Sequence, residues 1–205
     1  LEGAQGTLLD IDIGTYPFVT SSHPISGGIT TGLGLPVQSV ERLIGIFKAY
    51  TTRVGAGPFP TELFDEAGDR LQVQGAEFGA TTGRKRRCGW FDAVAARYSC
   101  QVNGFTELAL TKLDVLDQFD KIKVCTAYEL DGSQLPGFSA AIHQLEEVTP
   151  VYSELLGWQT ETSGLRSADT LPTEARRYIR QLEELLQVPI TRVSVGAERS
   201  QILTL

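Results

Sequence analysis

The sequence contains no methionine, and it has only two histidines and three cysteines in 205 residues. Because the chain opens on Leu1 without an initiator, we expect it to be a piece of a longer protein. Cys88, Cys100 and Cys125 are odd in number and lack a C-x-x-C pair, which favours reduced thiols over a disulfide framework or a zinc site. This pattern predicts a cytoplasmic protein.

Long apolar runs are also absent. No stretch approaches the roughly 20 residues that a membrane-spanning helix needs, and none has the pattern of a signal peptide. We therefore expect no membrane among the partners of this chain.

Positive charge is in the minority, with 18 lysines and arginines against 25 acidic residues and a formal net charge of −7. Four of the cations follow one another at 84–87, so the rest of the chain is more acidic still. An acidic body argues against nucleic acid as a partner, because nucleic acid requires a broad positive surface. It leaves room for one pocket that takes a small anion.

The stretch from Gly79 to Arg87 places two threonines between glycines and ends in those four cations. Glycine lets a backbone approach a ligand closely, and the planar fork of arginine suits carboxylates and phosphates. Taken alone, the stretch is more typical of a solvated basic loop. The rest of the sequence shifts the interpretation toward an anion site with a mobile lid.

Hydrophobic periodicity predicts alternating helices and short strands. Apolar residues at three- and four-residue spacing predict helices at 36–50, 90–102 and 172–186. Short apolar runs predict strands at 51–55, 108–110, 122–128 and 192–196. A helix or a hairpin fits 65–74, whereas 134–158 follows no clear pattern. This alternation predicts an α/β fold, with a central mostly parallel sheet flanked by helices on both faces.

Two further segments are expected near a ligand. Residues 1–35 are rich in glycine and threonine, and packed loops of this kind often line ligand sites. The helix predicted at 90–102 begins just after the basic stretch. Helix N-termini favour anions, so this helix start and the basic stretch are expected to act on one ligand.

The strand at 108–110 leads into Thr111-Lys112-Leu113-Asp114 at its C-terminal end, where ligands bind in open α/β sheets. This x-K-x-D pattern suits guanine, because the aspartate can accept hydrogen bonds from ring N1–H and from the exocyclic amine. The lysine stem can cover the base with its methylenes. A surface pair of Lys112 and Asp114 explains these four residues equally well.

Several motifs, taken in order, resemble the adenylosuccinate synthetase family. They are E-G-A-Q-G-T at 2–7, D-I-D at 10–12, G-T-Y-P at 14–17, V-T-S-S at 19–22, R-V-G-A-G-P-F-P-T-E-L at 53–63, F-G-A-T-T-G-R-K-R-R at 78–87 and T-K-L-D at 111–114. The resemblance thins at 130–170 and returns at 172–203. It implies a fold related to the P-loop NTPases, with this chain as the C-terminal half of one domain and the N-terminal half missing.

The resemblance also implies an activity. The family joins IMP and L-aspartate, with hydrolysis of GTP and with Mg²⁺, to make adenylosuccinate in the AMP branch of purine biosynthesis. The reaction passes through 6-phosphoryl-IMP, and the enzyme is a homodimer. Both chemical steps concentrate negative charge, so cations and oriented donors are the expected tools.

The resemblance assigns binding residues at matching positions. Those that match the IMP site are Gln5, Thr20, Val54 and Arg84. Those that match the loop closing on aspartate are Ala80, Thr81, Thr82, Gly83, Arg84, Lys85 and Arg86. Those that match the GTP site are Arg86, Lys112, Leu113, Asp114, Ser194, Val195 and Gly196.

The departures from the family pattern concern catalysis. No G-x-x-x-x-G-K run exists in the chain, and the resemblance puts the phosphate loop, the catalytic residues and the magnesium ligands in the missing N-terminal half. We therefore expect no catalytic residue and no metal ligand in this chain, and no ligase activity from it alone. Ile13 and Lys85 stand where many members have histidine and arginine. The alternative is a non-catalytic guanine-nucleotide-binding module.

Overall fold

The computed structural model describes residues 1–79 and 83–205 of the chain. The strands are β1 (Ile44–Lys48), β2 (Thr51–Arg53), β3 (Arg87–Gly89), β4 (Phe91–Asp92), β5 (Glu107–Thr111), β6 (Lys121–Leu130), β7 (Ser133–Gln134), β8 (Thr149–Leu156), β9 (Ile190–Ser194) and β10 (Ile202–Thr204). The α-helices are α1 (Gly27–Leu33), α2 (Glu66–Gln74), α3 (Ala93–Asn103), α4 (Phe138–Ala141) and α5 (Thr173–Leu186). The short 3₁₀ helices are η1 (Thr7–Leu9), η2 (Val37–Ser39), η3 (Leu113–Leu116), η4 (Ala168–Thr170) and η5 (Arg199–Gln201).

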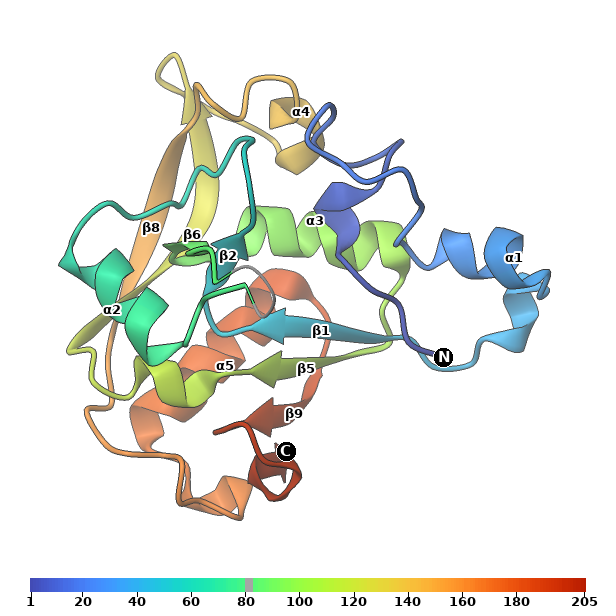
Figure 1. The fold of residues 1–205 in the computed structure, drawn as a ribbon. Helices are drawn as coiled ribbons and strands as arrows, with labels where there is room; N and C mark the ends of the chain where they lie inside the picture. The colour runs from blue at the N-terminus through green and yellow to red at the C-terminus, as the bar shows by residue number, and fades with distance from the viewer. Residues whose placement is uncertain (80–82) are drawn as a thin grey trace.

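The central sheet has the strand order β1-β5-β9-β10. β1, β5 and β9 run parallel, with Lys48 opposite Thr111 and Leu110 opposite Val193, and β10 closes the edge antiparallel to β9. Figure 1 shows the arrowheads of the parallel strands pointing the same way, toward α2. The predicted α/β class and the mostly parallel sheet are confirmed.

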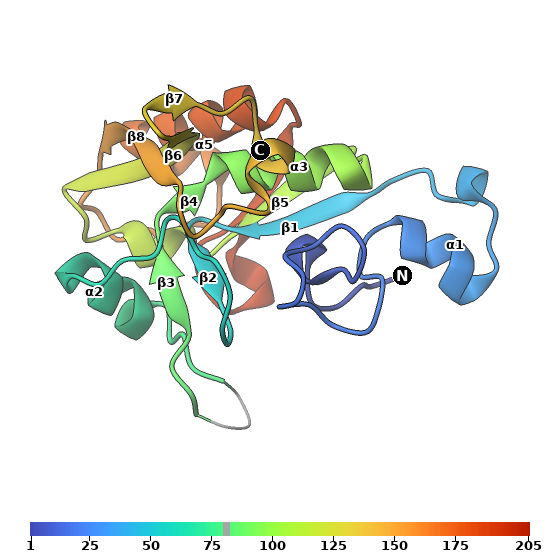
Figure 2. The ribbon, with the colours of Figure 1, turned by 90° about the horizontal axis from the view of Figure 1, so that it is seen from above.

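Helices α3 and α5 cover one face of this sheet, as Figures 1 and 2 both show. Leu108 and Val193 point into the core on that face, with 1% and 0% of their surface exposed. On the other face Ile44 and Ile46 are 40% and 68% exposed. The prediction of helices on both faces is therefore wrong for the described part of the chain.

The helix predicted at 36–50 is also wrong, because 44–48 forms strand β1. The spacing of apolar residues there imitates a helix, but exposure alternates from Ile44 through Ile46 as in a strand. Gly45 faces the core, where an added Cβ would meet the Leu108 and Phe105 side chains at 2.7 Å. A glycine at this position lets β1 and β5 pack without a clash.

A second sheet pairs β6 with β4, β7 and β8. β6 and β8 form a long antiparallel pair, in which Lys121 lies opposite Leu156 and Glu129 opposite Thr149. The prediction of a strand at 122–128 is confirmed, but β8 falls in the stretch that showed no pattern. Its residues are exposed or only partly buried, so they lack a clear apolar alternation.

Helix α5 forms as predicted, and its buried residues repeat with helical spacing: Ala175, Tyr178, Ile179, Leu182 and Leu186. The Tyr178 hydroxyl donates to Ala49 O at 2.6 Å, which ties the helix to the end of β1. Helix α2 resolves the choice left open at 65–74, since the Asp65 carboxylate caps it by accepting from Gly68 N at 3.1 Å. In the described residues, we find no helix with the length and apolar content to cross a bilayer.

Candidate functional site

The turn after β5 is built around Lys112. This residue lies in the left-handed region with φ 60° and ψ 38°, a conformation that costs free energy for any residue except glycine. Its backbone N–H donates to Ser194 Oγ, 3.1 Å away at the end of β9. The structure thus brings together the two segments that were predicted to enclose guanine.

Asp114, in the same turn, has an acceptor that the described part of the chain leaves unused. Its Oδ1 is buried and has no hydrogen-bond partner among the described residues. Burial raises the pKa of this carboxyl group, and the nearby charge of Asp117 also raises it. Asp117 differs, because its oxygens accept from Trp158 Nε1 and Thr162 N, both at 2.6 Å. Since buried acceptors are nearly always paired, donors on a ligand would complete Asp114. Asp10 Oδ2, in the N-terminal loops, is the other buried carboxylate oxygen without a partner among the described residues.

The other residues predicted at the guanine site have little side chain to offer a ligand. Leu113 and Val195 are completely buried in the core. A Cβ on Gly196 would meet the side-chain amide of Gln201 at 2.3 Å. If these three positions touch a nucleotide, they do so through their main-chain groups.

Glu77, in the loop after α2, is completely buried and holds several cations together. Its Oε1 accepts from Lys48 Nζ at 2.8 Å, from Lys112 Nζ at 2.9 Å and from the Tyr50 hydroxyl. Its Oε2 accepts from Lys48 Nζ and Arg86 Nη1, both at 2.9 Å. One carboxylate therefore joins the end of β1, the turn after β5 and the basic stretch. We call these residues (Lys48, Tyr50, Glu77, Arg86 and Lys112) the Glu77 cluster.

The Glu77 cluster carries excess positive charge. Burial alone would raise the pKa of Glu77, but hydrogen bonds from Lys48, Tyr50 and Lys112 lower it to about 2. Burial lowers the pKa of Lys48, against the opposing effect of Glu77. Burial also raises the pKa of Tyr50, with Glu77 adding to the rise, so the hydroxyl stays a donor. An ionised carboxylate that faces two lysines and an arginine leaves a local field that favours an anion.

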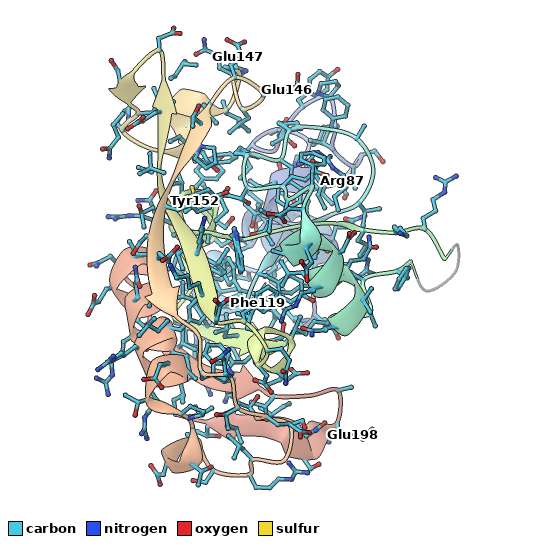
Figure 3. All side chains as sticks on the ribbon, turned by 90° about the vertical axis from the view of Figure 1, so that its left-hand side faces the viewer. Arg87, Phe119, Glu146, Glu147, Tyr152 and Glu198 are labelled. Carbon is cyan, nitrogen blue, oxygen red and sulfur yellow. The ribbon has the colours of Figure 1, made fainter. Side chains whose placement is uncertain are left out.

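The described residues on either side of 80–82 pair as two antiparallel arms next to Glu77, with Phe78 opposite Lys85; we call these arms the hairpin. Arg86 N donates to Glu77 O at 2.9 Å, and Gly79 N donates to Arg84 O at 2.8 Å. Figures 2 and 3 show the two described arms reaching away from the body of the molecule. The base of the predicted lid is thus attached to the same carboxylate as Lys112.

The remaining residues of the hairpin divide into two groups. Gly83 has φ 62°, which favours glycine, and Arg84 and Lys85 are exposed. The residues predicted to bind aspartate that lie outside the described part of the chain are Ala80, Thr81 and Thr82.

Arg87, which follows the hairpin, is used by the fold. Its Nε donates to Glu62 Oε1 at 2.7 Å, and its Nη1 donates to Gly57 O at 2.8 Å. Its guanidinium also lies 5.5 Å from the centre of the Phe59 ring. Figure 3 labels Arg87 close to the start of the projecting hairpin. These contacts fix the strand β3 from which the hairpin extends.

The residues predicted to bind IMP lie in the N-terminal loops and beside β2. Ser22 Oγ donates to Gln5 Oε1 at 3.1 Å and lies 2.8 Å from Thr20 Oγ1, so Gln5 and Thr20 belong to one polar group. Val54 is 72% exposed. Its neighbour Arg53 donates to Thr15 Oγ1 at 2.9 Å, which joins β2 to the N-terminal loops.

The start of α3 does not serve as an anion site. Asp92 caps this helix by accepting from Val94 N at 3.1 Å and Ala95 N at 3.0 Å. It also accepts from the Tyr128 hydroxyl. Burial raises the pKa of Asp92 to about 6, although these hydrogen bonds oppose the rise. The helix amides are occupied by a residue of the chain itself, so the prediction that they share a ligand with the basic stretch is wrong.

Asp10, Asp12 and His23 form a group whose possible metal-ligand atoms lie within 4.8 Å of one another. Asp10 Oδ1 accepts from the backbone amides of Asp12 and Ile13 at 3.0 and 3.2 Å. His23 Nδ1 lies 3.5 Å from Asp10 Oδ2. A capped turn with a nearby histidine accounts for these contacts. One of its three donors is an imidazole nitrogen, whereas Mg²⁺ prefers oxygen ligands, so we assign no magnesium to this group.

Sequence reasoning missed Lys48, Tyr50 and Glu77. Lys48 was assigned to a helix, which hid its place at the end of a strand next to Thr111. Recognition of β1 as a parallel neighbour of β5 could have placed Lys48 beside Lys112. Glu77 gave no signal, because its partners lie 9 to 35 residues away in the sequence.

At the carboxyl edge of its sheet, this α/β fold has a carboxylate oxygen without a partner among the described residues, a basic hairpin and a partly buried cluster of cations. These features define a protein with a candidate anion site. The profile of the family described as adenylosuccinate synthetase matches residues 1–203. The chain belongs to the adenylosuccinate synthetase family.

Relatives and a solved structure agree with this assignment. The chain is 58% identical to the adenylosuccinate synthetase of Pelobacter propionicus over 204 residues, 100% of this chain and 47% of that protein. It is 55% identical to that of Moorella thermoacetica, with 100% and 48% covered. It superposes on a fully ligated adenylosuccinate synthetase from Plasmodium falciparum with a TM-score of 0.97 and 39% identity, covering 100% of this chain and 49% of that one.

A more distant match shares the fold alone. A succinoaminodeoxyadenylate synthetase from cyanophage S-2L gives a TM-score of 0.58 at 18% identity, covering 99% of this chain and 45% of that one. The chain spans about half the length of the relatives that it matches. These shares of length do not bear out the prediction of a C-terminal half.

Proposed function

We propose that the complete protein containing this chain joins IMP and L-aspartate, with hydrolysis of GTP, to make adenylosuccinate. Membership of the family supports this proposal. The observation that carries it is the pairing of Lys112 and Arg86 with one buried carboxylate, Glu77. Two residues predicted to take the nucleotide come from segments far apart in the sequence and meet at the edge of the sheet.

Asp114 is the proposed reader of guanine. Its unpaired oxygen suits the N1–H and exocyclic amine of guanine, and adenine does not present that pair of donors. A nucleotide that leaves a buried carboxylate unpaired loses roughly 1–3 kcal/mol of binding. The Lys112 stem is proposed to cover the base, with the main chain of Leu113 and of 194–196 around it.

The basic hairpin is the proposed grip on the anionic substrates. The O6 oxygen of IMP is a poor leaving group until the γ-phosphoryl group of GTP is transferred to it. The aspartate amine then displaces phosphate from 6-phosphoryl-IMP. Arg84 is proposed to touch IMP and aspartate, and Arg86 to touch GTP and aspartate, where their charges oppose the negative charge that develops. The aspartate site is completed by 80–83 and Lys85.

IMP is proposed to lie along the polar group formed by the N-terminal loops. Gln5 and Thr20 share Ser22 as a neighbour. An amide close to a hydroxyl supports the proposed contact to a ribose or a phosphate. Val54 is proposed to contact the ribose through its backbone. Arg53 joins this region to the strand that pairs with the base of the hairpin.

Other attributes belong to the complete protein. We propose that it works in the cytoplasm as a homodimer and requires Mg²⁺, which would screen the phosphates of GTP. We place the magnesium ligands and the catalytic residues outside this chain.

Steady-state turnover tests the proposal. The complete protein should form adenylosuccinate from IMP, L-aspartate and GTP with Mg²⁺, and the chain 1–205 alone should form none. Binding of GTP by the complete protein without any turnover would instead support the non-catalytic guanine-nucleotide-binding module.

A further inference from the structure

Glu77 is saturated by the protein and has no capacity left for a ligand. Its two oxygens accept five hydrogen bonds from Lys48, Tyr50, Arg86 and Lys112 in the described residues. A carboxylate offers about four lone-pair sites. Glu77 can therefore act on a bound nucleotide only through the side chains that it holds.

Lys112 depends on Glu77 for its orientation. Its ammonium donates to Glu77 Oε1 at 2.9 Å and to Gly75 O at 2.5 Å, so it is drawn toward the loop after α2. The side chain is 35% exposed. With the ammonium held at this end, the methylene stem becomes the surface that a flat base can cover.

Arg86 depends on Glu77 through both its side chain and its main chain. Its Nη1 donates to Glu77 Oε2 and its backbone N donates to Glu77 O, each at 2.9 Å. Gln72 Nε2 donates to Arg86 O at 2.9 Å and fixes the other side of the peptide. The base of the hairpin and Lys112 are therefore hydrogen-bonded to the same residue, Glu77.

We propose that Glu77 is a positioning residue that orients Lys112 toward the nucleotide base and Arg86 toward the reacting anions, and so couples the two parts of the site. This inference rests on the proposed function. Without the carboxylate, Lys48, Lys112 and Arg86 are like charges in one partly buried space and repel one another. One substitution at a residue that touches no substrate should then weaken two substrates together.

The test compares Glu77→Gln with Glu107→Gln in the complete protein. Glu107 is a matched control, because it is a shielded carboxylate on β5 that pairs with Arg42 and Arg192. We expect Glu77→Gln to raise the KM for GTP and the KM for L-aspartate by about tenfold each, the cost of one charge-assisted hydrogen bond. Glu107→Gln should leave both KM values at the wild-type level. Wild-type KM values for either substrate in Glu77→Gln would overturn the inference.

Glu77→Asp provides a second variant in case Glu77→Gln fails to fold. It keeps the charge but withdraws the carboxylate by one methylene group. We expect its KM for GTP and for L-aspartate to lie between those of the wild type and Glu77→Gln, or above the wild type if Glu77→Gln is unfolded. Wild-type KM values in Glu77→Asp, where Glu77→Gln is unfolded, would show that Glu77 serves stability alone.

A readout without turnover separates this inference from the proposed function. If the wild-type protein forms no adenylosuccinate, the proposed function fails, and amide hydrogen exchange tests the positioning alone. Exchange at 83–86 and 112–114 should be faster in Glu77→Gln than in Glu107→Gln. Equal exchange in the two variants would overturn the positioning role.

Discussion

The two ends of strand β5 carry similar ion-pair groups, but the two groups differ in how completely their buried polar atoms are hydrogen-bonded. At the N-terminal end, Glu107 pairs with Arg42 and Arg192 and accepts from Thr191 Oγ1 at 2.5 Å. At the C-terminal end, Lys112 enters the Glu77 cluster. Both groups place a shielded carboxylate among cations, so sequence and composition alone do not separate them.

The difference lies in what is left unpaired. The Glu107 group contributes no buried atom without a hydrogen-bond partner among the described residues, whereas Asp114 Oδ1 and Arg86 Nε at the other end lack one. Arg42 beside Glu107 is also more open, at 63% exposed, whereas Arg192 at 37% is close to the cations of the Glu77 cluster: Lys48 at 25%, Arg86 at 31% and Lys112 at 35%. A completed group stabilises the fold, and an incomplete one at the carboxyl edge is where a ligand is expected.

The largest effect should come from the exposed hairpin at the C-terminal end. Arg84→Leu in the complete protein should lower kcat/KM for IMP and for L-aspartate by about 100-fold, because one charged donor to the transition state is lost. Steady-state kinetics with each substrate varied in turn measures this. Near-normal kcat/KM values would show that Arg84 does not contribute to the site, and they would weaken the functional distinction between the two ends of β5.

The next effect is a pH dependence of stability at the Glu77 cluster. Since the folded pKa of Glu77 is lowered to about 2, its ionisation stabilises the fold above the unfolded value, and this stabilisation is lost as pH falls from about 4.5 to about 2. The expected difference in unfolding free energy between wild type and Glu77→Gln at pH 6 is on the order of 2 kcal/mol, because solvent screens part of the interaction. Urea unfolding from pH 6 to pH 3 should show this difference shrinking toward acid. A difference that stays constant with pH would contradict the assigned charge state.

A smaller effect is expected from Tyr50→Phe, which removes one donor to Glu77 and leaves the three cations in place. The free energy of unfolding should fall by roughly 1–2 kcal/mol, with little change in the KM for GTP. Chemical denaturation and steady-state kinetics measure the two quantities. A large rise in the KM for GTP would show that the hydroxyl also sets the position of Lys112.

The smallest effect should come from the N-terminal end. Arg42→Ala removes a mostly exposed partner of Glu107, and exposed ion pairs contribute little to stability. All KM values of the complete protein should match the wild type, and the melting temperature should change only slightly. A tenfold change in any KM would show that the Glu107 group also affects substrate binding, which would contradict the difference between the two ends of β5.

The sequence predicted the elements whose patterns were strong and local. Helix α5 repeats its apolar residues through several turns, and the strand that precedes Thr111 is a short apolar run ended by polar residues. The prediction from sequence failed at 44–48, where apolar residues happen to have helical spacing although exposure alternates as in a strand. It also failed at β8, whose partly buried residues give a weak signal.

The candidate site could be predicted from the sequence only where its residues form short contiguous motifs. Lys112 and Asp114 were found because four consecutive residues follow a strand, and the basic stretch because its charges are adjacent. The Glu77 cluster was not, because it is assembled by the parallel register of β1 and β5 and by a loop between them. Long-range contacts of this kind depend on tertiary packing, and local periodicity does not report them.

The most direct test of the central claim is the nucleotide selectivity of Asp114→Asn in the complete protein, with kcat/KM measured for GTP and for XTP. Xanthine carries an oxygen where guanine carries its exocyclic amine, so an asparagine amide can donate to it. We predict that the ratio of kcat/KM for GTP to that for XTP falls by at least about tenfold relative to the wild type. An unchanged ratio would contradict the role of Asp114 as the reader of the base.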